Sequence, residues 1–185
     1  MSYISEVRPP FGEDVQTVGT VATATGLAVT EEGDAINHKT ILTLTDFAVG
    51  SAVAAADLAV GALLYTLPAG AQIVKAVYFN VALTGTITIV GDTPDIGVGS
   101  TIGTGAIALL TTTMIDYVDG QTSGAISGAN AVTVLKTATA GAFTGIALNV
   151  AASAKTFYLN CADGWAGAGD VTATGVIHIM WQMAS

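Results

Sequence analysis

The chain has 185 residues, about half of them apolar, and only 10% are charged, with a formal net charge of −9. One domain of this length can bury roughly 70% of the surface that its unfolded chain exposes, so it can form a sizeable core. Nucleic-acid binding is disfavoured because it requires clustered lysine and arginine, and the five basic residues here are widely spread.

The composition favours strands over helices. The apolar residues are chiefly Ala, Val, Ile and Leu, mixed with abundant Thr and Gly, whereas glutamate occurs only four times. β-branched side chains suit a pleated sheet, and amphipathic surface helices need many more charged residues. A surface with so few ions also loses little hydration when another subunit covers it. We therefore predict an all-β protein that works in contact with neighbours.

Residues 1–16 are predicted to form an extended N-terminal arm, and residues 17–185 a single β-sandwich domain. Two consecutive prolines in the arm cannot donate ladder hydrogen bonds. The arm is interpreted either as a frayed terminus or as a segment that lies on a neighbouring subunit. It lacks the succession of a secretory signal, so we expect synthesis in a cytoplasm without classical export. The residues predicted at the neighbour contact are Tyr3, Arg8 and Phe11.

The segment from residue 39 to residue 85 has the pattern of short strands. In 39–49 leucine and threonine alternate, which indicates a strand with one buried face. The alanine-rich segment 50–61 is ambiguous between a loop and one helical turn. In 62–85 a Pro-Ala-Gly turn separates two strands, and the second is apolar on both faces, with Tyr78 on one of them. Such a strand is either central and covered or half of an interface.

The stretch 91–105, GDTPDIGVGSTIGTG, looks like a loop built to hold a ligand. Its glycines have the wrong spacing for a dinucleotide fingerprint, and no lysine follows them as in a phosphate-binding loop. Asp92 and Asp95 would suit a Ca²⁺ ion, but a calcium loop supplies a denser run of oxygen ligands. A turn between strands is the favoured interpretation, with calcium binding as the alternative.

Further strands are predicted within 106–118, 130–141, 143–151, 155–165 and 170–185. Eight to ten short strands at fairly regular spacing predict an antiparallel sandwich or jelly roll. Trp181 falls on the apolar face of the last strand. For Trp165, at a loop tip, three interpretations stay open: packing on its own sandwich, burial by a partner, or stacking on a sugar beside Asp163 or Asp170.

Residues that carry chemistry are sparse. His38 and His178 are the two histidines, and each lies beside strand-like sequence, where a structural role is expected. No G-x-S-x-G motif is present. Cys161 has no second cysteine to pair with and alternates in phase with apolar neighbours, which indicates a buried thiol. The longest apolar stretch, 52–67, is too short to span a bilayer. We predict no catalytic, cofactor or metal site, and a protein that is not an enzyme.

Four stretches carry a resemblance to a known group of proteins. They are HKTILTLTD (38–46), LYTLPAGAQIVKAVYFNVALTG (64–85), GDTPDIGVGSTIGTGAIALL (91–110) and FYLNCADGWAGAGDVTATGVIHIMW (157–181). Their succession resembles small structural proteins of tailed bacteriophages, in particular capsid decoration (cement) proteins. The resemblance implies a jelly-roll-like β-sandwich subunit, often trimeric, on the outer surface of an icosahedral head. Its partners would be its own copies and the major capsid protein, with no nucleic acid, membrane or small-molecule substrate.

Two functions therefore follow from the sequence. The first is a virion structural subunit that stabilises an assembled head by bridging shell subunits, since a protein that binds only the assembled state opposes its rupture. The alternative is a host-surface or glycan recognition module of a phage fibre or adhesin. The residues predicted at interfaces are Tyr3, Arg8, Phe11, Tyr78, Trp165 and Trp181.

Overall fold

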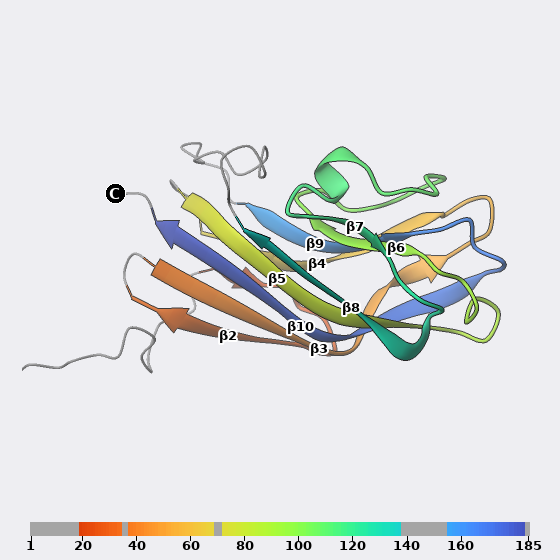
Figure 1. Cartoon of the computed structure of the whole chain (residues 1–185), viewed down its shortest axis with the longest axis horizontal. Helices are drawn as coiled ribbons and strands as arrows, with labels where there is room; N and C mark the ends of the chain where they lie inside the picture. The colour runs from red at the N-terminus through yellow and green to blue at the C-terminus, as the bar shows by residue number, and fades with distance from the viewer. Residues whose placement is uncertain (1–18, 35–36, 69–71, 138–154, 184–185) are drawn as a thin grey trace, which may run out of the picture.

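The computed structural model describes residues 19–34, 37–68, 72–137 and 155–183. Within these ranges the chain forms ten strands and one short 3-10 helix, in two five-stranded antiparallel sheets packed face to face (Figure 1). The predicted all-β sandwich is confirmed. The elements are β1 (Thr20–Val21), β2 (Leu27–Gly33), β3 (Asn37–Ala52), β4 (Ala59–Thr66), β5 (Gln72–Gly85), β6 (Asp95–Gly99), η1 (Thr112–Met114), β7 (Val118–Thr122), β8 (Ser127–Thr137), β9 (Thr156–Ala162) and β10 (Gly169–Met183).

The strand order is that of a jelly roll. One sheet, the covered sheet, has the order β1-β4-β9-β6-β7, and the other, the open sheet, has the order β2-β3-β10-β5-β8. The antiparallel pairs are nested: β6 pairs with β7, β5 with β8, β4 with β9 and β3 with β10. Contacts of β10 with β5 and of β9 with β6 complete the two sheets. Eight strands in two such sheets make a jelly roll, to which β1 and β2 add one edge strand each.

The alternation seen in the sequence corresponds to burial in the structure. On β3, Leu42 and Leu44 are buried between the sheets, and Thr43 and Thr45 are exposed. Successive side chains of a strand point to opposite faces, so this pattern places the leucines in the core. The largest fully buried side chains come from both sheets and include Trp181, Tyr65, Phe47, Phe79 and Phe157.

A β-bulge corrects the predicted faces of β5. Strict alternation along the strand predicted in 62–85 places Val74 on the same face as Tyr78 and Val77 on the other, but both valines are fully buried in the core. Val74 pairs with Trp181 and Ala76 with Met180, so Lys75 is an extra residue between two successive pairs. The extra residue shifts the alternation by one position, which turns Val74 inward.

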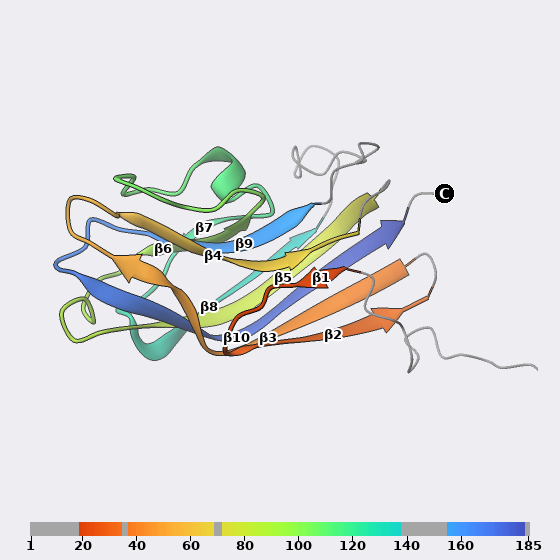
Figure 2. The same ribbon diagram turned by 180° about the vertical axis from the view of Figure 1, so that it is seen from behind.

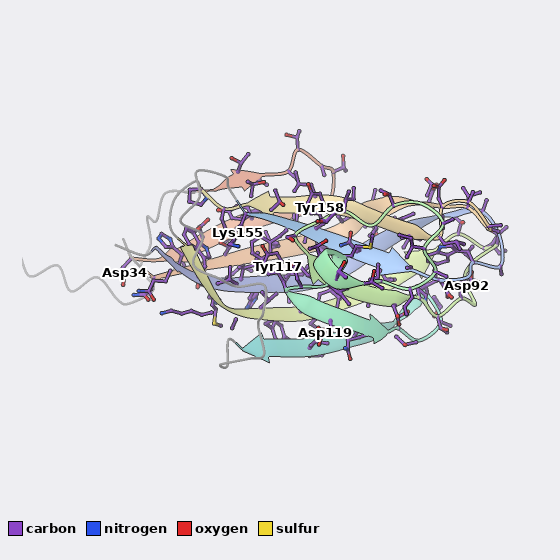
Figure 3. All side chains as sticks on the ribbon, turned by 90° about the horizontal axis from the view of Figure 1, so that it is seen from above. Asp34, Asp92, Tyr117, Asp119, Lys155 and Tyr158 are labelled. Carbon is purple, nitrogen blue, oxygen red and sulfur yellow. The ribbon has the colours of Figure 1, made fainter. Side chains whose placement is uncertain are left out.

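The connections between strands are divided between the two ends of the sandwich. The β3–β4, β5–β6, β7–β8 and β9–β10 connections lie at one end, with Asp92, whereas Asp34 lies at the other end (Figure 3). The alanine-rich segment 50–61 forms the end of β3, a tight turn and the start of β4, without a helical turn. No helix in the described ranges is long and apolar enough to cross a membrane.

Residues 100–117, which join β6 to β7, are the exception among the connections. This segment, here called the cover, folds back over the outer side of the covered sheet (Figures 1 and 2). The strand predicted within 106–118 is therefore wrong, because most of these residues form irregular turns and η1. Leu110 and Tyr117 are buried beneath this segment, whereas Ile107 and Leu109 are exposed, so its apolar composition reflects neither strand pairing nor uniform burial.

Candidate functional site

The stretch 91–105 comprises the end of the β5–β6 connection, strand β6 and the start of the cover, so the interpretation of the whole stretch as a turn between strands is wrong. Its two glycines on β6, Gly97 and Gly99, serve packing. An ideal Cβ on Gly97 would lie 2.7 Å from Ile115 Cγ2, and one on Gly99 would overlap the Met114 backbone. Both glycines are buried on the outer side of β6, directly under the cover. The absence of side chains lets the cover lie against the sheet, so the stretch is a packing surface.

Asn160 fastens the cover to the sheet. Its Oδ1 accepts a hydrogen bond from the Gly103 amide at 2.7 Å, and its Nδ2 donates to the carbonyls of Thr101 at 3.0 Å and Met114 at 2.7 Å. The side chain is fully buried on β9. Beneath the cover, Leu110 packs with residues of β4 and β9 in a second, smaller apolar cluster. The outer side of β6 and the adjoining parts of β4 and β9 are thus covered by the chain itself.

Asp92 and Asp95 do not converge on one point. The Asp92 carboxylate accepts a hydrogen bond from the Ala166 amide at 3.0 Å, and Asp163 accepts one from the Thr93 amide at 3.0 Å. These two bonds tie the β5–β6 connection to the β9–β10 connection in both directions. Asp95 accepts instead from the Thr122 hydroxyl on β7 at 2.9 Å. No group of three or more His, Cys, Asp or Glu side chains within the described ranges has the arrangement of a metal site.

Trp165 is packed on its own sandwich. Its side chain is 3% exposed, and its indole N–H donates to the Leu58 carbonyl at 2.9 Å. The interpretation of Trp165 as an exposed platform for a sugar is therefore wrong. Trp181 is 1% exposed and donates from its indole N–H to the Thr40 hydroxyl at 2.9 Å. In this conformation neither ring offers appreciable surface to a partner, because both fill positions in the core.

A buried polar cluster links the two sheets near β1 and β2. Glu31 Oε2 accepts a hydrogen bond from the Tyr65 hydroxyl at 2.6 Å, across the sandwich. Glu31 Oε1 lies 3.3 Å from the Thr40 hydroxyl and 3.8 Å from His38 Nδ1. His38 stacks on Trp181, with ring centroids 4.0 Å apart. The pKa of Tyr65 is raised well above its ordinary value, chiefly by burial and secondly by the hydrogen bond to Glu31. Sequence inspection missed this cluster because its members are distant along the chain.

This cluster has the character of a structural clasp. Its carboxylate points inward from β2, an edge strand of the open sheet, and is held by groups of both sheets. Inward-pointing charges on edge strands discourage further strand pairing.

Cys161 is buried as predicted, and its burial raises the pKa of the thiol. The thiolate form needed for nucleophilic attack is therefore disfavoured at neutral pH.

The outer side of the open sheet differs from that of the covered sheet, because no described segment lies on it (Figures 1 and 2). Five uncovered side chains are central to it: Ile41 on β3, Tyr78 on β5, and Val176, His178 and Met180 on β10. These five residues are here called the open face. His178 is paired in register with Ile41 on one side and Tyr78 on the other.

The open face is apolar for an exposed sheet surface. The solvent face of an antiparallel sheet usually carries polar residues, yet here only the imidazole among the five side chains ionises near neutral pH. The Tyr78 and His178 rings lie 5.4 Å apart with a tilt of 51°. The pKa of His178 is lowered below its ordinary value, chiefly by burial and secondly by the nearby positive charge of Lys39. The imidazole is therefore mainly neutral at pH 7, and the charges nearest to the open face are those of the Lys39–Glu32 ion pair beside Met180.

Of the six residues predicted at interfaces, Tyr78 lies on an uncovered surface, while Trp165 and Trp181 lie in the core. Tyr3, Arg8 and Phe11 fall outside the described residues. The sequence signal that identified Tyr78 was a strand apolar on both faces. The same signal on β10 would have added Val176 and Met180, which alternate with the buried isoleucines of that strand.

Comparisons with known proteins add no relative: no family model, curated protein or solved structure matches this chain. Its function therefore has to be inferred from the geometry of the chain itself.

Proposed function

We propose that this chain is a structural subunit that self-associates through the open face, and that its role is capsid decoration on the outer surface of a virion. The observation that carries this proposal is an uncovered sheet face with an apolar centre, the open face, on a fold in which the cover lies on the outer side of the other sheet. Jelly rolls occur in viral capsid proteins, but also in lectins and cupins, so the fold gives only an analogy.

The size of the sheet supports a stable contact. The five strands lie about 4.8 Å apart and rise about 3.3 Å per residue, and β2, β3, β10, β5 and β8 contain 7, 16, 15, 14 and 11 residues. The projected area is about 1,000 Å², whereas one partner in a standard interface buries about 800 Å². A part of the open sheet is therefore enough for a subunit contact, and the low charge of the chain keeps the cost of dehydrating it small.

A decoration subunit needs rigidity and contact surface rather than chemistry. The hydrogen bond between Glu31 and Tyr65 holds the two sheets together. The hydrogen bonds of Asp92 and Asp163 hold the β5–β6 and β9–β10 connections together at one end of the sandwich. Binding to an assembled shell, and not to its separate subunits, stabilises the shell by mass action, and many copies act together through avidity. The proposed partners are further copies of this chain, as a trimer, and the major capsid protein.

Sedimentation velocity at micromolar concentration tests the self-association. We expect an oligomer for the natural chain and a monomer for Tyr78→Glu, because the new charge would have to be buried at the contact. Ile87→Glu is the matched control: Ile87 is 90% exposed on the β5–β6 connection, away from the open face. A monomeric natural chain, or dissociation by the control alone, contradicts the proposal. Electron microscopy of the native particle would test the position on the head.

The alternative function, a recognition module of a fibre or adhesin, depended on an exposed aromatic ring at Trp165. The burial of that ring leaves this alternative without its candidate binding residue. A glycan screen in which Trp165→Ala abolishes binding, while the fold is retained, would restore it.

A further inference from the structure

His178 occupies the centre of the open face. Its strand, β10, is the middle strand of the open sheet, and His178 is paired in register with Ile41 on β3 and Tyr78 on β5. The outward-facing residues before and after it on β10 are Val176 and Met180. Its in-register and same-strand neighbours on this surface are therefore all apolar or aromatic.

The imidazole of His178 can take up a proton in the separate chain. The residue is only partly buried, and no described segment lies over it. Its ring lies beside that of Tyr78, with centroids 5.4 Å apart. Within residues 19–34, 37–68, 72–137 and 155–183, no hydrogen bond or ion pair engages its nitrogens. Solvent can therefore hydrate the ring in both of its protonation states.

The charged and titratable groups around His178 come from three strands. Lys39 on β3 forms an ion pair with Glu32 on β2 at 3.1 Å. On β5, Tyr78 is the titratable neighbour, and Lys75 lines a shallow pocket together with Lys39. Burial first and Lys39 second lower the pKa of His178, and the charge of Glu32 offsets a part of this. These surroundings therefore offer an imidazolium no carboxylate of its own.

We propose that self-association through the open face is controlled by pH, with protonation of His178 as the event that separates the copies. This inference rests on the proposed self-association and names its regulation. A second copy on the open face removes water from the ring, and an imidazolium enclosed by apolar side chains without a carboxylate is costly. The neutral ring is covered at a much smaller cost, so association favours the deprotonated form.

The sign of the effect follows from linkage. Because the contact lowers the proton affinity of His178, copies that associate in acid must release the proton that the separate chain had bound. Below the pKa of the separate chain, the dissociation constant should rise by up to about tenfold for each pH unit and each covered imidazole. Acid also reduces the net charge of −9, which weakens the repulsion between copies. A general charge effect therefore has the opposite sign.

Sedimentation equilibrium of the full chain at pH 7.5, 6.5, 5.5 and 5.0, at constant salt, tests the control by pH. We expect the dissociation constant of the natural chain to be at least about threefold larger at pH 5.0 than at pH 7.5. The variant His178→Gln keeps a polar side chain that does not titrate in this range, so its dissociation constant should not rise. Circular dichroism at each pH checks that the copies stay folded.

A permanent charge at the same position provides a second test. His178→Lys should weaken association at least about tenfold at pH 7.5, as protonation does in acid. Ile87→Lys is the matched control, because Ile87 is 90% exposed and lies away from the open face, and it should associate like the natural chain. This pair of variants decides the matter if His178→Gln itself does not associate.

The outcomes separate this inference from the function on which it rests. A natural chain that is monomeric at pH 7.5 overturns the proposed function. An oligomer whose dissociation constant stays constant or falls between pH 7.5 and 5.0 overturns the control by pH alone. An equal rise in His178→Gln, or equal association of the two lysine variants, does the same, because the charge on His178 would then not be what separates the copies.

Discussion

Replacement of Asn160 by alanine should weaken the attachment of the cover to the sheet. The amide makes three hydrogen bonds with the cover, and removing them leaves the buried Gly103 N–H without its partner. A net value of about 1 kcal/mol for each bond, with about 1 kcal/mol more for the orphaned amide, predicts a loss of about 4 kcal/mol. Domains of this kind are stable by about 5–15 kcal/mol, so the loss is a large part of the total.

Two measurements check this prediction. Urea unfolding should give a free energy of unfolding lower by about 4 kcal/mol, with an unchanged slope if the native state stays compact. Amide hydrogen exchange should show the largest loss of protection in residues 100–117, because local opening of the cover becomes easier. If the cover leaves the sheet while the sandwich persists, the unfolding free energy falls less and the exchange effect becomes larger.

Gln121→Ala is the matched control for this substitution. Gln121 also carries an amide side chain with two hydrogen bonds, but they go to the nearby carbonyls of Asp119 and Gly120. We expect a change within about 0.5 kcal/mol, as for most surface substitutions. An Asn160→Ala variant as stable as this control, with full protection of residues 100–117, would refute the role given to Asn160.

Three further predictions concern packing, pH and the clasp. Gly99→Ala should lower the melting temperature and loosen the cover, whereas Gly91→Ala, with nothing within 4 Å of its Cβ, should be neutral in the same thermal scan. His178 has a lowered pKa in the folded chain, so the unfolded chain binds more protons as the pH falls below about 6.5 and stability should decrease there. Comparison with His178→Gln in urea at pH 7.5 and 5.5 isolates this effect, and an equal pH dependence in both would contradict it. Tyr65→Phe removes the 2.6 Å bond to the buried Glu31 carboxylate and should cost about 1.5–3 kcal/mol in urea unfolding.

The fold class and several strands could be predicted from local pattern. On β3 the leucines of the alternating pattern are buried and the threonines are exposed. On β10 the two isoleucines are buried, and the residues that alternate with them face outward. The pleat of a strand repeats every two residues, so a half-buried strand records its own orientation in its sequence. The burial of Cys161 was predicted on the same basis and is confirmed.

The cover could not be recognised in this way. Residues 106–110 are as apolar as a strand, but Leu110 packs against Ala59 and Ala162, and the four residues before it are exposed. The glycines that admit the cover belong to a different element, β6, and the amide that fastens it belongs to β9. A local window contains none of these partners.

The sequence by itself determined the strand pattern, the sparse charge and the scarcity of reactive side chains, because each of these is a property of neighbouring residues. Only the tertiary structure decided which surfaces remain uncovered. The jelly-roll pairing joins β3 to β10 across more than one hundred residues, and it places Trp165 and Trp181 inside while Tyr78 stays outside. Burial of a given face depends on which distant segment packs against it, and that partner is not encoded in the period of the strand.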